Sequence, residues 1–171
     1  MTIYTKTGDR GETRVFDPKT KKPVTISKSS KIIETIGNID ELNSLLGIVG
    51  GQADIQSDLF TINAILAGTK LSFGWAKTKK LEKEIDKLEK TLPVQKNFIY
   101  YEGDPKAALL FLARAVARRA ERSLVSLPDL IANRYQLITY LNRLSDYLFI
   151  KARETNFKSY FKEKAWMGKT F

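Results

Sequence analysis

The chain has 171 residues and a formal net charge of +10, with 43% hydrophobic and 28% charged residues. This composition is typical of a folded globular protein, and the length favours a single domain over residues 1–171. The sequence has no cysteine and no histidine, which excludes disulfides, thiolate or imidazole metal sites, cysteine nucleophiles and Ser-His-Asp catalysis. Its chemistry must therefore use carboxylates, hydroxyls, lysine and arginine, together with a bound cofactor or a hard metal ion held by oxygen ligands.

The excess positive charge predicts an anionic partner, which is nucleic acid, a membrane surface or a phosphorylated small molecule. Residues 1–31 carry eight cationic and three anionic side chains, and residues 151–171 carry six and two. Solvated termini are the alternative explanation for this distribution. The sequence has no signal-peptide pattern and no apolar run of roughly 20 residues. We therefore expect a cytoplasmic protein.

Residues 1–28 are polar and contain Gly8, Gly11, Pro18 and Pro23, so we expect a loop with at most short extended pieces. Residues 4–13 read Tyr-Thr-Lys-Thr-Gly-Asp-Arg-Gly-Glu-Thr. Glycine lets successive amide groups point at a phosphate, while threonine and lysine add donors and charge. The segment is not a P-loop, and both an anion site and a plain turn fit these residues.

Helical periodicity begins at Lys31 and predicts five helices. In chain order they are expected at residues 31–49, 55–71, a stripe from 81 to 92, 105–126 and 130–156. The first should stop at Gly50, the third at Pro93, and the fourth should begin with Asp104 as N-cap and Pro105 at the first position. These elements predict an all-α, up-and-down bundle of four to five helices with an irregular N-terminal segment.

The fourth predicted helix carries Arg114, Arg118 and Arg122 at four-residue steps, with Arg119 and Glu121 beside them. Like charges at this spacing cost an isolated helix about 0.2–0.5 kcal/mol per pair. One carboxylate cannot neutralise four guanidinium groups, so the stripe requires further anions. A solvated face, a polyphosphate site and a subunit interface are all compatible with it.

Two other helices place polar residues among apolar ones. Asn142 shares a helix face with Ser145 and Asp146, and a mid-helix asparagine indicates a specific amide hydrogen bond, either structural or to a ligand. In the first helix, Asp40 and Glu41 are adjacent. Asp40 is a natural partner for an arginine within the chain or across an interface, and acid–base catalysis by paired carboxylates is the rival interpretation.

Four motifs occur in order: Tyr4-Thr-Lys-Thr-Gly-Asp-Arg-Gly11, Gly37-Asn-Ile-Asp-Glu-Leu-Asn43, Arg118-Arg-Ala-Glu-Arg122 and Leu141-Asn-Arg-Leu-Ser-Asp146. Together they resemble the PduO-type ATP:cob(I)alamin adenosyltransferases over nearly the whole chain. The resemblance implies a helical-bundle subunit that assembles as a homotrimer and binds ATP between neighbouring subunits. It also implies transfer of the 5′-deoxyadenosyl group of ATP to the cobalt of reduced cobalamin, with release of triphosphate.

Matched by position, the resemblance assigns ATP contacts to Thr5, Lys6, Thr7, Gly8, Thr13, Arg14 and Lys28, and, from the adjoining subunit, to Arg118, Arg119, Glu121, Arg122 and Asn142. Arg118 and Arg122 would be the catalytic cations. Asp40 would pair with Arg118 across the interface, with Arg114 supporting that network. Phe98 would lie against the corrin, with core packing as its alternative role. The family often has Pro-Gly-Gly near Tyr101 and a histidine where this chain has Phe111.

The implied chemistry suits the composition, because Co(I) is itself the nucleophile. The protein would align the reactants and stabilise the triphosphate leaving group with Lys, Arg, backbone N–H groups and Mg²⁺, without metal ligands of its own. A reductase would supply Co(I), and a cobalamin-dependent client enzyme would take the product. Two alternatives are a basic helical nucleic-acid-binding protein, with steeply salt-dependent binding, and a non-catalytic ATP- or cobalamin-binding regulator. No nucleic-acid module is recognised in the sequence, so we expect no nucleic-acid or membrane partner.

Overall fold

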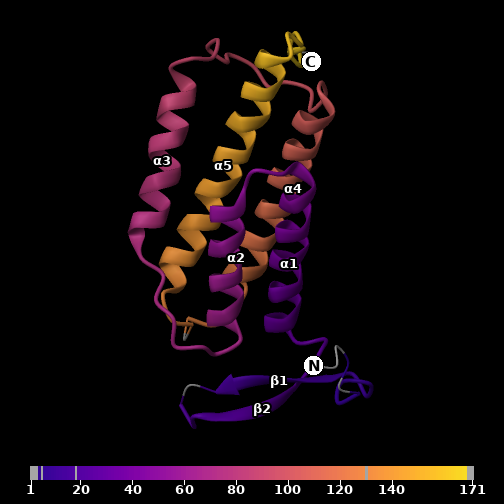
Figure 1. The fold of residues 1–171 in the computed structure, drawn as a ribbon, viewed down its shortest axis with the longest axis vertical. Helices are drawn as coiled ribbons and strands as arrows, with labels where there is room; N and C mark the ends of the chain where they lie inside the picture. Colours follow the sequence, from indigo (N-terminus) through magenta and orange to yellow (C-terminus); the bar gives the residue numbers. More distant parts are fainter. Residues whose placement is uncertain (1–3, 5, 18, 130, 169–171) are drawn as a thin grey trace.

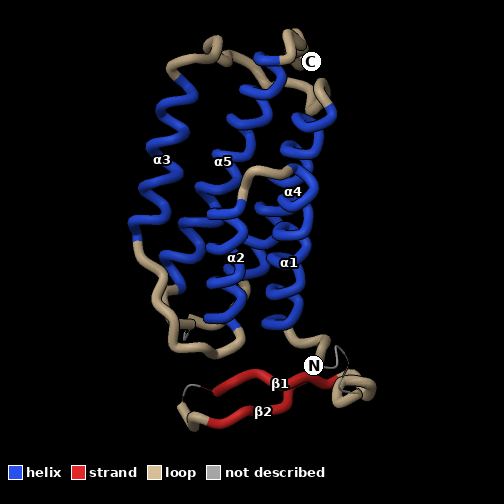
Figure 2. Tube along the Cα trace, in the orientation of Figure 1, coloured by secondary structure: helices blue, strands red, loops and turns tan. Residues whose placement is uncertain are grey.

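The computed structural model describes residues 4, 6–17, 19–129 and 131–168. These residues form five helices that run alternately up and down: α1 (Lys31–Val49), α2 (Ala53–Leu66), α3 (Trp75–Glu89), α4 (Pro105–Val125) and α5 (Arg134–Lys158) (Figure 1). Two strands, β1 (Glu12–Asp17) and β2 (Lys22–Ser27), form a hairpin beneath one end of the bundle (Figure 2). The predicted helical bundle is confirmed. The prediction of an all-α chain missed this small two-stranded sheet.

The core lies where α4 packs against α1 and α5, while α3 packs on α5 and α2 on α1. Apolar side chains at helical spacing form it, and the leucines of α5 are completely buried. Burying each such leucine stabilises the fold by about 1.5–3 kcal/mol. On α4 the buried positions include Ala113, Ala117 and Ala120, whose small side chains allow its neighbours to approach closely.

The ends of α1 and α4 follow the predicted signals. The Asp104 carboxylate accepts a hydrogen bond of 2.8 Å from the N–H of Lys106, with Pro105 at the first helical position. At the end of α1, Gly50 leaves the helix with a φ of 72°, while its N–H still donates to the Leu46 carbonyl over 3.0 Å.

The helix α2 ends at Leu66, well before the predicted residue 71. Gly68 has a φ of 95°, a left-handed conformation that a helix cannot continue through. The N–H of Thr69 turns back to donate to the Ala64 carbonyl over 2.9 Å. This glycine signal was present in the sequence and should have ended the predicted helix.

The helix α5 begins at Arg134 rather than at Leu130, which lies outside the described residues. Asn133 precedes it in the left-handed region, with a φ of 57°. The Arg134 guanidinium donates to the carbonyls of Val125 and Leu127 over 2.7 and 3.2 Å. It therefore binds the end of the α4 segment to the start of α5.

The hairpin replaces the loop expected for residues 1–28. Its strands pair antiparallel, with Asp17 opposite Lys22. The backbone N–H of Phe16 donates to the Ala67 carbonyl over 2.8 Å, which attaches the hairpin to the end of α2. The expected short extended pieces are confirmed, but their pairing was not predicted.

A polar contact joins three helices on the side away from α4. Tyr140 of α5 is completely buried, and its hydroxyl donates to Asp58 of α2 over 2.9 Å. Lys77 of α3 forms an ion pair with the same carboxylate. Burial, and then the negative charge of Asp58, raise the pKa of Tyr140.

Candidate active site

The arginine stripe lies on α4, and only part of it is neutralised within this chain. Arg119 forms an ion pair with Glu41 of α1. Arg118 and Arg122 are exposed, and neither forms an ion pair within the described residues. Asp40 is likewise exposed and has no ion pair in that part of the chain. Two cations and one carboxylate are therefore available to a ligand or to another subunit.

Asn142 of α5 faces α4, and its Nδ2 donates to the Glu121 Oε1 over 3.0 Å. Both side chains are half-buried. The amide of Asn142 therefore has a structural partner, which fixes its orientation beside the arginine stripe. The hydrogen bond to Glu121 does not test whether Asn142 also contacts ATP, so that contact stays a prediction.

Arg114 lies toward the other end of α4 and packs among aromatic rings. Its guanidinium is 5.2 Å from the Tyr101 ring centroid and 5.4 Å from that of Phe149, distances typical of cation–π contacts. Phe111 is buried beneath, 5.1 Å from Tyr101 and 5.8 Å from Phe149 between ring centroids. Tyr101 and Phe111, which both depart from the family pattern, thus contact each other.

The N-terminal segment folds back on Lys28. The Lys28 Nζ donates to the Gly8 carbonyl over 2.8 Å, and its backbone N–H donates to the Gly11 carbonyl over 2.8 Å. Gly11 has a φ of 82° and Lys6 a φ of 57°, so this segment turns twice through the left-handed region. Lys28 is thereby held next to the predicted anion-binding residues.

The other predicted ATP contacts of this segment are distributed around that turn. Thr7 and Arg14 are exposed and Thr13 is half-buried. Thr5 lies outside the described residues. The segment lies below the bundle near the start of α1 (Figure 1). A hydrogen bond of 2.8 Å between the hydroxyls of Thr35 and Ser123 joins that start to the end of α4.

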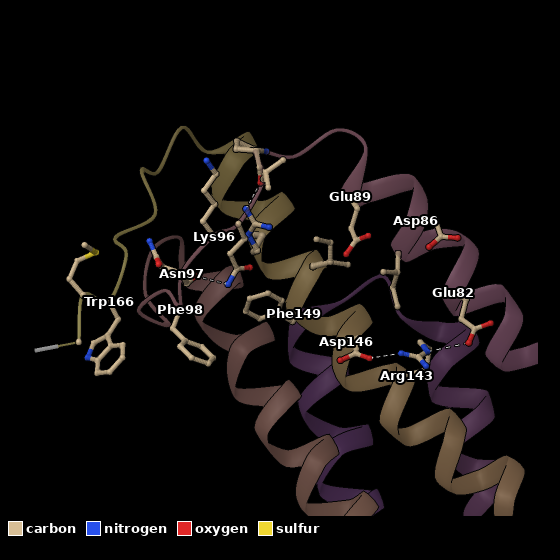
Figure 3. A pocket seen from close by; sticks show the side chains of 18 residues that line it. Glu82, Asp86, Glu89, Lys96, Asn97, Phe98, Arg143, Asp146, Phe149 and Trp166 are labelled. Atoms are coloured by element: carbon tan, nitrogen blue, oxygen red, sulfur yellow. Dashed lines mark hydrogen bonds and ion pairs between the residues drawn. The ribbon is translucent and has the colours of Figure 1, made fainter. Parts of the chain in front are cut away.

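A cavity of about 1330 Å³ opens between α3, α5 and residues 93–98 (Figure 3). Phe98 and Trp166 lie on one side of it, edge to face, with ring centroids 6.4 Å apart. Phe98 is 72% exposed, so the alternative role of Phe98 as a core residue is wrong. Phe149 and Ile150 supply further apolar surface.

The opposite wall of this cavity is acidic. Glu82, Asp86 and Glu89 of α3 line it together with Asp146 of α5 (Figure 3). Arg143 donates to Glu82 over 3.3 Å and to Asp146 over 2.7 Å. The cavity therefore has hydrogen-bond acceptors on one wall and aromatic rings on the other. The acidic wall contrasts with the net positive charge of the chain.

The C-terminal segment completes the rim of this cavity. The backbone N–H of Trp166 donates to the Phe98 carbonyl over 2.7 Å. Arg153 is 6% exposed, donates to the Pro93 carbonyl over 2.9 Å and pairs with Glu163 at 3.1 Å. Because Pro93 and Glu163 belong to the two segments that form the rim, Arg153 joins them to α5.

Among the residues that the structure describes, no group of three or more acidic side chains lies close enough together to hold a metal ion. None of the helices in those ranges combines the length and hydropathy that crossing a membrane requires.

Residues 3–155 match the family model described as cobalamin adenosyltransferase. The chain belongs to this family. The corrinoid adenosyltransferase of Bacillus subtilis is 36% identical over 93% of this chain and 89% of its own length. The corrinoid adenosyltransferase MMAB of Bos taurus is 34% identical over 96% of this chain and 75% of its own length.

Solved structures agree with this assignment to the cobalamin adenosyltransferase family. A variant of the PduO-type ATP:corrinoid adenosyltransferase of Lactobacillus reuteri, complexed with cobalamin and ATP, superimposes with a TM-score of 0.86 and 30% identity. The match covers 96% of each chain. The resemblance to the PduO-type adenosyltransferases that the sequence motifs indicated is therefore confirmed over nearly the whole chain.

Several residues around the cavity were given no role from the sequence. Trp166 and Arg153 lie outside the motifs that carry the resemblance, and Arg143 lies within one of them without an assigned role, although each lines the cavity. A tryptophan close to the C-terminus was the available signal, because tryptophan side chains are on average highly buried. Nothing in the local sequence indicated that Trp166 returns to Phe98.

Proposed function

We propose that this chain transfers the 5′-deoxyadenosyl group of ATP to the cobalt of cob(I)alamin, giving adenosylcobalamin and triphosphate. The single observation that carries this proposal is the match over 96% of the chain to an adenosyltransferase complexed with cobalamin and ATP. The exposed arginines of α4 and the aromatic cavity support it, because they suit the two chemically different substrates.

In this reaction the electron pair of Co(I) forms a bond to the ribose 5′ carbon. The bond between that carbon and the 5′ oxygen breaks, the oxygen leaves on triphosphate with the bonding pair, and cobalt becomes Co(III). Negative charge grows on the leaving group, so the useful protein groups are permanent cations close to it. Arg118 and Arg122 fit this role because they are exposed and have no ion pair within the described residues.

ATP would bind between two subunits of a homotrimer. One subunit contributes Thr5, Lys6, Thr7, Gly8, Thr13, Arg14 and Lys28, and its neighbour contributes Arg118, Arg119, Glu121, Arg122 and Asn142. Asp40 of the first subunit would pair with Arg118 of the second, near Arg114. The unpaired state of Asp40 and Arg118 in the described chain supports this arrangement. Mg²⁺ would accompany the ATP phosphates and complete their neutralisation.

Cobalamin would enter the cavity beside Phe98. The apolar face of Phe98 and Trp166 offers no lone pair to cobalt, because a phenyl ring has none and the indole nitrogen is only a donor. The corrin edge carries carboxamide groups, whose N–H donors match the acidic wall of Glu82, Asp86 and Glu89. The two walls thus suit the two surfaces of a corrin.

We further propose that a reductase supplies Co(I), that a client enzyme receives adenosylcobalamin, and that the protein acts in the cytoplasm.

The test of the proposed reaction is anaerobic incubation of the purified protein with Mg-ATP and chemically reduced cob(I)alamin. The expected result is the absorption spectrum of adenosylcobalamin together with triphosphate. A folded protein that forms neither product overturns the proposal, and binding of both substrates without triphosphate release would assign it to a regulator of the same fold.

A further inference from the structure

A second cavity, of about 440 Å³, lies next to the cavity beside Phe98. Residues 93–97 and Arg153 line both cavities, so the two are adjacent spaces with a common wall. The remaining lining comes from Leu92 and Ile99, from Phe157 in the last turn of α5, and from residues between 161 and 165. Its volume lies within the range of small-ligand pockets, about 300–1,000 Å³.

The chemistry of the second cavity differs from that of the first. Two phenylalanines line it, Phe157 with 53% and Phe161 with 38% of its surface exposed. Lys162 lines this cavity alone and Lys96 lies on the wall common to both, and neither forms an ion pair within the described residues. Exposed aromatic rings beside unpaired cations favour a flat aromatic ligand that carries a negative charge.

The wall between the cavities is already held in place. Arg153 is buried, and its charge is neutralised by Glu163, with 3.1 Å between Nε and the carboxylate. The same guanidinium donates to the Pro93 carbonyl over 2.9 Å. Lys96 and Lys162 are therefore the cations that remain for a ligand. Because Arg153 already fixes the wall between the cavities, a ligand would not have to immobilise these residues when it binds.

Cobalamin itself carries a group with this chemistry. A tail hangs from its corrin, and this tail consists of a phosphodiester, a ribose and a dimethylbenzimidazole ring. We propose that the second cavity binds the nucleotide tail of cobalamin while the corrin occupies the first cavity, an inference that rests on the proposed function. The flat ring packs against Phe157 and Phe161, and the phosphodiester lies beside Lys96 and Lys162.

Charge explains why the tail enters the second cavity and not the first. The first cavity contains the carboxylates of Glu82, Asp86 and Glu89, which repel a phosphodiester. The shared wall of residues 93–97 places the second cavity next to the corrin edge.

The experiment compares cobalamin with cobinamide, a corrinoid that lacks the nucleotide tail. Dissociation constants of cob(II)alamin and cob(II)inamide are measured by anaerobic titration in the presence of Mg-ATP, for the wild-type chain and for Phe161→Ala and Lys162→Ala. Each substitution should weaken cob(II)alamin binding about tenfold, which is typical of losing a ring-stacking or phosphate contact, and should leave the cob(II)inamide value unchanged. Both side chains are exposed, so the fold should survive, which far-UV circular dichroism checks.

The matched controls are Phe60→Ala and Lys90→Ala, exposed residues that line neither cavity. They should change neither dissociation constant. Equal weakening of both corrinoids by Phe161→Ala and Lys162→Ala would overturn the tail site, as would unchanged cob(II)alamin binding. A wild-type chain that binds neither corrinoid would instead contradict the proposed function itself.

Discussion

The carbonyl oxygen of Phe16 lies where a side chain on Gly68 would begin, since a Cβ built on Gly68 falls 1.7 Å from it. The neighbouring hydrogen bond from the Phe16 N–H to the Ala67 carbonyl measures 2.8 Å. The hairpin that carries Thr13 and Arg14 is thus attached to the bundle at a point where only glycine fits. Gly68 also has a φ of 95°, which disfavours other residues.

We therefore expect Gly68→Ala to detach the hairpin while the five helices remain folded. The KM for ATP should rise about tenfold, because the N-terminal phosphate contacts lose their position, while the KM for cobalamin changes little. Steady-state kinetics measures this difference, and trypsin should cleave faster after Lys21. The control is Gly74→Ala in the same connection, where nothing lies within 4 Å of the new Cβ. Equal behaviour of the two variants would contradict the role of Gly68.

Arg122→Ala should lower kcat by about 10²–10³ because it removes a cation placed at the developing triphosphate charge. Its stability should change by no more than about 0.5 kcal/mol, since Arg122 is exposed and has no ion pair within the described residues. Activity assays with urea unfolding separate the two effects. Lys79→Ala, an exposed cation of α3, is the control and should retain full kcat. A variant Arg122→Ala with normal kcat removes this residue from the proposed site.

Asp40→Ala should weaken assembly, because Asp40 is proposed to pair with Arg118 of a neighbouring subunit. Removing one partner of such a pair typically costs about 2–5 kcal/mol, so the dissociation constant of the proposed trimer should rise more than tenfold. Sedimentation equilibrium measures it. Glu41→Ala is the matched control, since Glu41 pairs with Arg119 inside the chain and should leave assembly intact. An interface role for Asp40 fails if both variants sediment like the wild type and bind ATP equally well.

Tyr140→Phe should destabilise the fold by about 1–3 kcal/mol, because Asp58 then loses a hydrogen bond at a site where its side chain is only 15% exposed. Urea unfolding at neutral pH measures this loss. Tyr135→Phe, at a 71% exposed position, is the control and should be nearly neutral.

The same residue predicts a pH dependence at alkaline pH. Burial, and then Asp58, raise the pKa of Tyr140 above its unfolded value of about 10. The folded state therefore favours the neutral hydroxyl of Tyr140. Its contribution to the free energy of unfolding is complete below a pH of about 10 and is lost as the pH rises further. The wild-type stability should fall toward that of Tyr140→Phe by up to about 1.4 kcal/mol per pH unit. Parallel pH curves for the two proteins would show that Tyr140 does not contribute this way.

The helices were predictable where local signals determine them. Asp104 and Pro105 marked the start of α4, and Gly50 marked the end of α1, because caps and chain breaks act on neighbouring residues. The hairpin was not predicted, because its strands are short and polar and depend on a distant contact between Phe16 and Ala67. Such pairing leaves no local periodicity in the sequence.

The candidate site was predictable only in part, for a similar reason. Motif resemblance selected Phe98 and the arginines of α4, and the structure shows Phe98 at the edge of a cavity. Trp166 was missed because the C-terminal segment reaches Phe98 through an antiparallel backbone contact. Arg153 was missed because its partners Pro93 and Glu163 are distant in the sequence. The arrangement between subunits, which involves Asp40 and Arg118, stays a prediction.

The central claim is that Co(I) attacks the 5′ carbon of ATP on this protein. The most direct measurement uses ATP labelled with ¹⁸O at its 5′ bridging oxygen, incubated anaerobically with cob(I)alamin and the protein, with both products analysed by mass spectrometry. The account predicts equal amounts of adenosylcobalamin and triphosphate, with the label in the triphosphate. Release of ADP and phosphate, or no cobalt–carbon bond from a folded protein, would contradict it.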